Sequence, residues 1–200
     1  MESVTTQEAL ERLQRGNERF RNGVAEGAGR DVARRKELVG SQHPFAIILC
    51  CSDSRVAPEI AFDTGLGDLF VVRVAGNVAN TSSIGSIEYA VAKLGTKLVV
   101  VMGHESCGAV GAVVSAAEKG GDIDKSLDYL QNLIHLLGHI RPALEASEVH
   151  EADSIARTNA RLTGERLIDE SEIISAAVEN DGVQIVSAFY QFDSGIVEFD

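Results

Sequence analysis

The sequence predicts a single α/β domain, in which a central, mostly parallel β-sheet of four to five strands is flanked by helices. Three observations predict this class. The 200 residues are enough for one domain with a full core, four short apolar runs alternate with helical stretches, and each run is continuously apolar. Strands that alternate with helices favour parallel pairing, and a strand buried on both faces is apolar at successive positions.

The apolar runs define the expected strands, and the segments between them define the expected helices. The strands are predicted over residues 45–51, 69–74, 97–103 and 183–190, with a turn at 193–195 leading into a short closing strand at 196–199. The helices are predicted over residues 83–94, 107–119 and 126–146, with Pro142 near the end of the third, and within 154–180. No repeat, low-complexity tract or linker divides the chain, so residues 1–200 are treated as one domain.

Residues 1–40 are predicted to form a helical arm, and residues 41–200 the α/β core. A first helix is expected to open at Thr5, with Glu8 three residues later as a capping partner. Its apolar positions, Leu10, Leu13 and Phe20, form a narrow stripe on a charged helix. Such a stripe suits packing on a neighbouring surface, so we expect the N-terminal helices to extend onto a partner subunit. A second short helix is expected over residues 31–38.

Composition excludes several classes of function. The chain carries 18 Lys and Arg against 30 Asp and Glu, a net charge of −12, and a chain this acidic repels phosphate backbones, so nucleic acid is not an expected partner. No apolar run approaches the ~20 residues of a membrane helix. The N-terminus lacks the apolar segment and cleavage signature of a secretory signal, so the expected location is cytoplasmic. Three cysteines, two of them adjacent, make a poor disulfide framework and instead favour metal binding or catalysis.

Metal-ligating residues concentrate at the ends of two predicted strands. The first strand ends in Cys51-Ser-Asp-Ser-Arg55, and the third is followed by His104-Glu-Ser-Cys107-Gly108. The carboxyl ends of parallel strands share one rim of a sheet, where ligands bind. Two cysteines and one histidine, with a fourth position open, form a recognised catalytic zinc arrangement. The sequence therefore predicts a zinc site made by Cys51, His104 and Cys107.

Cys50 competes with Cys51 for the first ligand position. Neighbours on a strand point to opposite faces, so one of the two reaches the site, and we choose Cys51 because it is the last residue of the strand. Cys50 is interpreted as a small buried apolar residue. Asp53 and Arg55 can form a fixed fork. Asp53 then either accepts a hydrogen bond from zinc-bound hydroxide or occupies the fourth metal position, and the plainer alternative is a salt bridge that stabilises the loop.

Residues 51–55 together with 103–108 resemble the paired signature of the β-class carbonic anhydrases. Residues 67–77, 85–91 and 175–180 resemble that family as well, and the likeness runs from about Gln42 to the C-terminus. The resemblance implies one Zn²⁺ per chain, held by the three residues named above. It implies reversible hydration of carbon dioxide to bicarbonate and a proton, in which zinc-bound hydroxide attacks the substrate and is oriented by the Asp53–Arg55 dyad.

The resemblance also implies a substrate pocket and an assembly. Gln42 is expected to donate a hydrogen bond to bound bicarbonate. Phe70, Ala75 and Tyr89 are expected to line the pocket, some of them across a dimer interface, and the backbone of Gly108 to come close to the site. A homodimer or homotetramer is implied. The bicarbonate-regulated branch of the family carries a Trp where this chain has Ile48, and the chain contains no Trp. The chain therefore resembles the plant-like branch.

Two other functions fit the same residues. The first is hydrolysis of carbonyl sulfide or carbon disulfide on the same zinc site. The second is a non-catalytic zinc module, which would need a fourth protein ligand, and Asp53 is the nearest candidate. Separately, His135 and His139 are four residues apart on a predicted helix and could share a metal, but no third ligand is evident, and we interpret them as ordinary helix positions. Gly65-Leu-Gly67 lacks the spacing of a dinucleotide-binding fingerprint.

Overall fold

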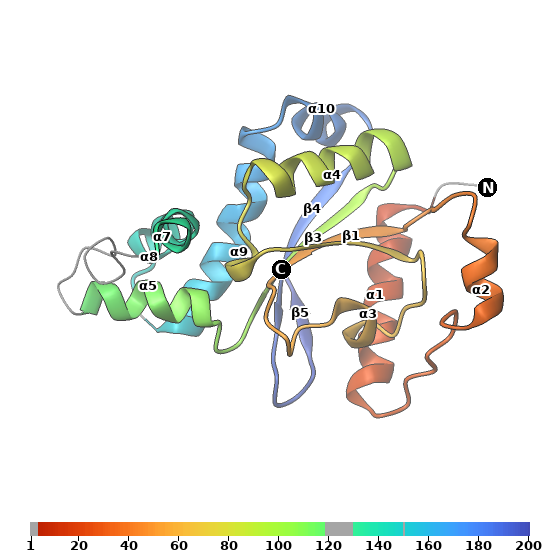
Figure 1. Cartoon of the computed structure of the whole chain (residues 1–200), viewed down its shortest axis with the longest axis horizontal. Helices are drawn as coiled ribbons and strands as arrows, with labels where there is room; N and C mark the ends of the chain where they lie inside the picture. The colour runs from red at the N-terminus through yellow and green to blue at the C-terminus, as the bar shows by residue number, and fades with distance from the viewer. Residues whose placement is uncertain (1–3, 119–129, 150) are drawn as a thin grey trace.

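The structure is a computed structural model that describes residues 4–118, 130–149 and 151–200. A five-stranded sheet in the order β2-β1-β3-β4-β5 crosses the molecule (Figure 1). The strands are β1 (Ala46–Cys50), β2 (Leu69–Arg73), β3 (Leu98–His104), β4 (Gln184–Tyr190) and β5 (Val197–Phe199). The first four are parallel, and β5 pairs antiparallel with β4. The predicted α/β class and all five predicted strands are confirmed.

Helices cover both faces of the sheet, which explains why the strands are continuously apolar. On β1, Ile48 and Cys50 pack toward α1 (Thr6–Arg21) and α3 (Pro58–Ala61). Ile47 and Leu49 pack on the other face, toward the helices α4 (Thr81–Leu94), α9 (Ala152–Asp169) and α10 (Glu172–Asn180). All five β1 side chains, that of Ala46 included, are fully buried, as expected for a strand between two helical layers.

The strand order places a topological switch point between β1 and β3. The chain leaves β1 toward β2 on one side, whereas β3 lies on the other side of β1, with Cys50 opposite Met102 in parallel register. Side chains that follow β1 and end β3 therefore meet at one point of the carboxyl rim, where α/β sheets bind their ligands. Beyond this rim lie η1 (Ala75–Asn77), α5 (Gly108–Glu118), α7 (Gln131–Gly138) and α8 (Arg141–Ala146). In Figure 1, α5, α7 and α8 lie at the end of the molecule opposite α1 and α2 (Val32–Glu37).

One helix prediction is wrong. In place of a continuous helix over residues 126–146, α7 ends at Gly138 and α8 begins at Arg141, and residues 126–129 lie outside the described residues. Pro142 is in the first turn of α8 rather than near the end of a long helix. Proline lacks an N–H and its ring clashes with the carbonyl of the residue four positions earlier, so it is tolerated at a helix start and breaks a helix interior.

The first helix begins as predicted, but its apolar stripe packs within the chain. The Thr5 side chain accepts a hydrogen bond from the N–H of Glu8 and caps α1. Ala9 and Leu13 are buried in the core between α1 and the sheet. This stripe is therefore used by the chain's own sheet, and extension onto a partner subunit stays a prediction. Among the helices that the structure describes, none is long and apolar enough to cross a membrane.

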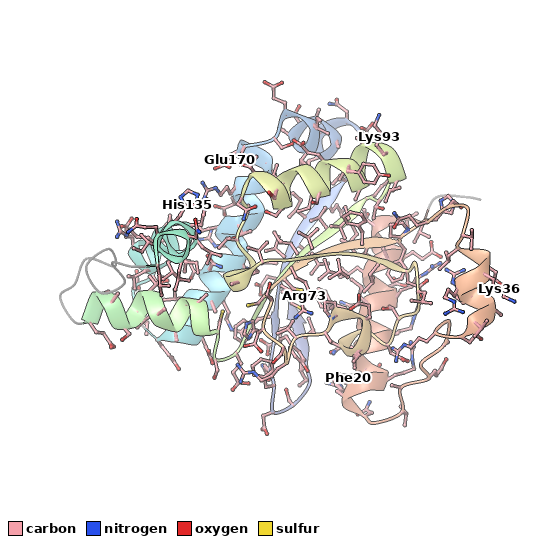
Figure 2. All side chains as sticks on the ribbon, viewed as in Figure 1. Phe20, Lys36, Arg73, Lys93, His135 and Glu170 are labelled. Atoms are coloured by element: carbon pink, nitrogen blue, oxygen red, sulfur yellow. The ribbon has the colours of Figure 1, made fainter. Side chains whose placement is uncertain are left out.

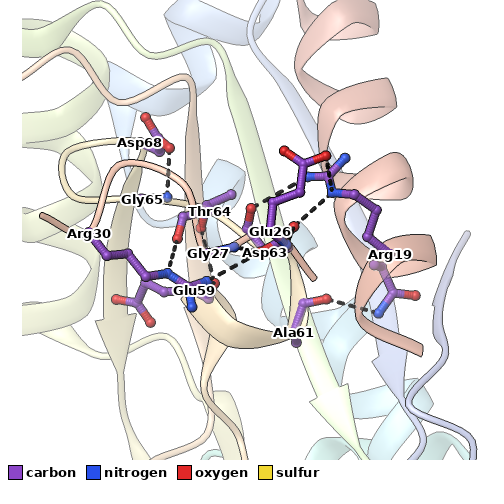
Figure 3. Close-up of polar contacts among 11 residues, drawn as sticks. Arg19, Glu26, Gly27, Arg30, Glu59, Ala61, Asp63, Thr64, Gly65 and Asp68 are labelled. Atoms are coloured by element: carbon purple, nitrogen blue, oxygen red, sulfur yellow. Dashed lines mark hydrogen bonds and ion pairs between the residues drawn. The ribbon is translucent and has the colours of Figure 1, made fainter. Parts of the chain in front are cut away.

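A buried carboxylate ties the segment after α1 to the core. The Asp63 side chain has no exposed surface and accepts hydrogen bonds from Arg19 Nε (2.7 Å) and from the N–H groups of Glu26 and Gly27 (both 2.9 Å), as Figure 3 shows. Burial opposes ionisation of Asp63, but these hydrogen bonds outweigh it and lower its pKa to about 2. The Asp63 carboxylate therefore ties the arm to the loop after α3, and both of its oxygens accept hydrogen bonds.

Candidate metal centre

Cys51, His104 and Cys107 come together at the switch point. Their ligand atoms lie within 4.8 Å of one another, and all three residues are buried. Across residues 4–118, 130–149 and 151–200, this is the one group of three or more such residues that could hold a metal ion. Cys51 follows the last residue of β1, His104 ends β3, and Cys107 precedes α5. The parallel register of β1 and β3 is therefore what brings residues from distant parts of the sequence to one point.

The orientation of His104 fits a metal ligand. Its Nδ1 lies 2.8 Å from the carbonyl oxygen of Glu105. A carbonyl only accepts hydrogen bonds, so the ring proton is on Nδ1 and the lone pair is on Nε2. Nε2 is buried and has no hydrogen-bond partner among the described residues. Buried polar atoms are almost always satisfied, and a metal ion facing the two sulfurs would satisfy this one.

The two sulfur atoms form a coupled pair in an environment that stabilises negative charge. Cys51 Sγ accepts hydrogen bonds from the N–H groups of Gly76 (3.3 Å) and Asp53 (3.4 Å). The pKa of Cys51 is lowered, first by a hydrogen bond from the Cys107 thiol and also by these two N–H groups. The pKa of Cys107 is raised because it gives that hydrogen bond and is buried, although the first N–H groups of α5 act in the opposite direction. A cation between the sulfurs would favour both thiolates.

Cys50 has the opposite environment. It is fully buried in the apolar cluster on the other face of β1, and burial raises the pKa of its thiol to about 12. The interpretation of Cys50 as a buried apolar residue is thus confirmed. Cys51, and not Cys50, lies beside His104 and Cys107.

Asp53 and Arg55 form the predicted fork. Asp53 Oδ1 accepts from Arg55 Nε (3.0 Å) and Oδ2 from Arg55 Nη2 (2.8 Å), while the Arg55 N–H also donates to Oδ1 (2.9 Å). These bonds hold the pKa of Asp53 well below its usual range, so it is a carboxylate at neutral pH. Arg73, labelled near the centre of Figure 2, donates to the carbonyl oxygens of Cys51 and Asp53 and fixes the loop backbone. The carboxylate oxygens of Asp53 are turned to Arg55, and Asp53 is not part of the ligand group.

Residues in left-handed backbone conformation shape the loops around the sulfurs. Gly76 has φ +68°, and a Cβ at this position would lie 2.6 Å from Ile140 Cδ1. Its carbonyl oxygen accepts a hydrogen bond from Asn159 Nδ2 (2.8 Å), which keeps its N–H directed at Cys51. Ser106, with φ +52°, donates its N–H to Asp153 Oδ1 (2.8 Å). Glycine tolerates positive φ without strain, whereas Ser106 requires such support.

The predicted pocket residues divide into two groups. Ala75 and Gly108 lie next to the cluster, in η1 and in the first turn of α5. Gln42 is exposed and precedes β1, so the strand, at ~3.3 Å per residue, separates it from Cys51 by roughly 16 Å or more. Phe70 pairs in register with Ile47, four residues before Cys51, and its ring lies 6.4 Å from that of Tyr89. Within one chain, Gln42, Phe70 and Tyr89 are therefore not brought to the metal cluster.

Sequence reasoning missed three residues at the site. Gly76 occurs within a segment already noted for its resemblance, but nothing in the sequence announces its hydrogen bond to a sulfur atom. Asp153 comes from the first turn of α9, 46 residues after Cys107 (153 − 107 = 46). Phe192 follows β4, and its ring lies 5.3 Å from the His104 ring. Each of these contacts depends on tertiary structure, and no local pattern signals it.

A mostly parallel sheet flanked by helices, with a buried Cys₂His cluster at its switch point that could hold a metal ion, defines an α/β protein with a candidate metal centre. The sequence profile of the carbonic anhydrase family matches residues 46–197. The chain is 37% identical over 187 residues to carbonic anhydrase 2 of Mycobacterium tuberculosis, which covers 94% of this chain and 89% of the relative. It is 50% identical to a carbonic anhydrase of Mycolicibacterium smegmatis over 112 residues, which are 56% of this chain and 54% of that protein.

Solved structures agree with the sequence comparison. The β-carbonic anhydrase CcaA superposes with a TM-score of 0.71 and 26% identity, over 95% of this chain and 94% of that one. A structure from work on two tetrameric β-carbonic anhydrases of Sordaria macrospora gives a TM-score of 0.63 and 26% identity, over 82% and 84% of the two chains. The chain belongs to the carbonic anhydrase family, in its β class. This membership supports carbon dioxide hydration as its activity.

Proposed function

We propose that Cys51, His104 and Cys107 hold one Zn²⁺ and that the chain catalyses the reversible hydration of carbon dioxide to bicarbonate and a proton. The observation that carries the proposal is the buried Nε2 of His104, which lacks a partner among the described residues and belongs to the same cluster as the two sulfurs. Cys₂His with one open position is an arrangement used by catalytic zinc, whereas structural zinc takes four protein ligands. The Asp53 carboxylate is engaged by Arg55, which supports the open form of the site.

Zinc in such a site supplies Lewis-acid activation of water near neutral pH. Asp53 stays ionised and accepts a hydrogen bond from the attacking oxygen, which orients its lone pair toward carbon dioxide. Arg55 holds both carboxylate oxygens from one side and so fixes the direction in which Asp53 can accept. Ala75 and the backbone of Gly108 form the near wall of the substrate pocket.

We infer that a second copy of the chain completes the pocket, in a homodimer or homotetramer. Gln42, Phe70 and Tyr89 lie away from their own chain's cluster, and 51% of the Tyr89 surface is exposed. Strand β2 is an edge strand, and its residues from Leu69 to Val72 are only half-buried. An apolar edge strand is a natural surface for association. In this arrangement Gln42 of one copy donates to bicarbonate at the cluster of the other.

Several finer assignments belong to the same proposal. The engaged Asp53 and the residue Ile48 support membership of the plant-like branch. A reducing, cytoplasmic location suits thiolate ligands and three free cysteines. We treat residues 1–200 as one catalytic domain, in which residues 1–40 form the arm and residues 41–200 the core.

Zinc content and carbon dioxide hydration, measured together by elemental analysis and stopped-flow, test the proposal. Cys51→Ala is expected to lose both zinc and activity, because a metal site loses most of its affinity when one of its three protein ligands is removed. Cys50→Ala is the matched control, since it removes a neighbouring thiol that faces the other side of the sheet, and it should retain one zinc per chain. Full zinc and full activity in Cys51→Ala would refute the ligand assignment.

Asp53→Ala separates the dyad from the metal site. This variant is expected to keep one zinc per chain and to lose about 100- to 1,000-fold in turnover at neutral pH, a loss typical of one hydrogen-bonding group at a reacting oxygen. An undiminished rate would reject the orienting role. The same stopped-flow instrument, supplied with carbonyl sulfide or carbon disulfide, tests the alternative: hydrolysis that is faster than carbon dioxide hydration would reassign the substrate.

A further inference from the structure

Arg55 is exposed for a residue with a positioning role. Its side chain is 53% exposed, whereas the Asp53 side chain that it holds is 17% exposed. A long side chain at such a position samples many rotamers, and an exposed ion pair alone restrains it weakly. Something else must fix the guanidinium if the direction of the Asp53 carboxylate is to be fixed.

A long hydrogen bond from Arg55 Nη2 to the carbonyl oxygen of Ser106 (3.4 Å) adds only a weak restraint, and the ring of Phe192 provides the closer contact with the face of the guanidinium. Arg55 Cζ lies 4.2 Å from the ring centroid, well within the ~6 Å of a cation–π interaction. A guanidinium stacked on a ring and hydrogen-bonded at its edge to a carboxylate is restrained both along and across its plane. Asp53 and Phe192 therefore contact different parts of the same group.

Phe192 is itself held firmly on several sides. Its N–H donates to Glu105 Oε2 (2.8 Å), and its ring lies 5.3 Å from the His104 ring and 5.5 Å from the Tyr190 ring. Glu105 is also the residue whose carbonyl oxygen accepts from His104 Nδ1. The turn between β4 and β5 is thus attached to the strand end that carries a metal ligand, and the position of the Phe192 ring follows that of the site.

The turn is anchored a second time, from α1. The Asn17 side chain donates to the carbonyl oxygen of Gly195 (2.8 Å) and accepts from the N–H of Val197 (2.9 Å). Both ends of the turn are therefore fixed, at Phe192 by Glu105 and at Gly195 by Asn17. A turn held in this way offers the ring as a rigid surface.

We propose that Phe192 is a positioning residue for the hydration reaction: its ring holds the Arg55 guanidinium, and through it the Asp53 carboxylate, in the catalytic orientation. The inference rests on the proposed function of the dyad. It adds the β4–β5 turn, which contributes no metal ligand, to the parts of the chain on which turnover depends. Phe192 acts through Arg55 and does not touch the reacting atoms.

A double-mutant cycle tests this role in the zinc-loaded, full-length protein. Phe192→Leu, Arg55→Leu and the double variant are compared by kcat/KM for carbon dioxide hydration and by zinc content. Phe192→Leu is expected to keep one zinc per chain and to lower kcat/KM by about 3- to 10-fold, the scale of one cation–π contact. In the Arg55→Leu background the same substitution should cause no further loss, because the group that Phe192 holds is already absent.

Two further variants separate the ring from packing. Phe192→Tyr keeps an aromatic face and should retain at least half of the wild-type kcat/KM, whereas Phe192→Met keeps apolar bulk without a ring and should resemble Phe192→Leu. Phe192→Met also serves if Phe192→Leu fails to fold. Phe199→Leu is the matched control. Phe199 belongs to the same hairpin, but its ring contacts Phe62 and no metal-site residue, so its loss should leave kcat/KM unchanged.

The outcomes distinguish the inference from the proposal beneath it. A wild-type protein without hydration activity refutes the proposed function, and full activity in Arg55→Leu refutes the dyad. If Arg55→Leu is impaired while Phe192→Leu and Phe192→Met are fully active, Phe192 has no positioning role. Equal fold losses from Phe192→Leu in both backgrounds also overturn the inference, because Phe192 would then act independently of Arg55.

Discussion

Replacing Asn17 with alanine is expected to destabilise the protein strongly. Asn17 is 5% exposed and makes three hydrogen bonds to the backbone: Nδ2 donates to the carbonyl oxygens of Ala61 (3.0 Å) and Gly195 (2.8 Å), and Oδ1 accepts from the N–H of Val197 (2.9 Å). It joins α1, the end of α3 and the strand β5. The Asn17→Ala substitution leaves three main-chain groups without this partner.

The expected loss follows from these three groups. A buried polar group left without a partner costs about 1–3 kcal/mol, and water entering the small space recovers part of the total, so we expect a loss of about 3–5 kcal/mol. A domain of this kind has roughly 5–15 kcal/mol of stability in all. With a urea m-value of ~2–3 kcal/mol/M for a chain of this size, the midpoint should fall by roughly 1–2 M.

Urea unfolding followed by circular dichroism measures this loss. Wild type and variant are compared zinc-loaded and at one protomer concentration, because bound metal and assembly both shift apparent stability. Asn180→Ala is the matched control, since Asn180 is exposed and its Nδ2 bonds only within its own helix, to Ala176 O. We expect a change below ~0.5 kcal/mol for the control. A midpoint for Asn17→Ala within about 0.3 M of the wild type would refute the reasoning.

Two further predictions follow from backbone geometry and from a buried charge. Gly76→Ala should cost about 2–4 kcal/mol of stability, because the new Cβ would lie 2.6 Å from Ile140 in addition to the strain of a positive φ. Gly95 also has a positive φ (+71°) but has open space around it, so Gly95→Ala should cost only ~1–2 kcal/mol. Thermal unfolding compares the two variants, and equal losses of stability would contradict the role of the contact. The depressed pKa of Asp63, about 2 against an ordinary 3.8, means that its contribution is complete above pH ~4 and is lost as pH falls toward 2. The stability difference between wild type and Asp63→Asn should therefore shrink over that range in urea titrations, and a constant difference would show that the carboxylate does not titrate as assigned.

The sequence was most informative where one strand or one loop carries the signal. Apolar runs located the strands to within one or two residues, most clearly for β1 and β3, whose residues are all buried. The candidate ligands could be found from the sequence for a related reason: Cys51 and His104 stand at the ends of apolar runs, Cys107 follows three residues after His104, and parallel strands bring such ends to one rim. The alternation of side chains along a strand showed that only one of Cys50 and Cys51 could reach the site, and the position of Cys51 at the end of the apolar run decided between them.

What the sequence could not supply depends on contacts between distant segments. Strand order is set by how the crossovers pack, so the switch point between β1 and β3 was not visible in advance. Pro142 was read as lying near the end of a long helix, but a proline is as compatible with the start of a new helix, and only tertiary packing distinguishes the two. The stripe of α1 was assigned to a partner subunit because amphipathicity shows that a face is covered without showing by what.

The placement of the proposed ligands at the ends of two neighbouring strands has a consequence for how the protein matures. Cys51 and Cys107 are separated by 56 positions (107 − 51 = 56), and they approach each other only when β1 and β3 have paired. An ion that binds both closes this long loop, and its binding free energy is then available only to chains that have formed the middle of the sheet. Uptake of the metal by a nascent chain would thus report that the central strands have assembled, and release of the metal would be among the earliest signs that they have begun to separate.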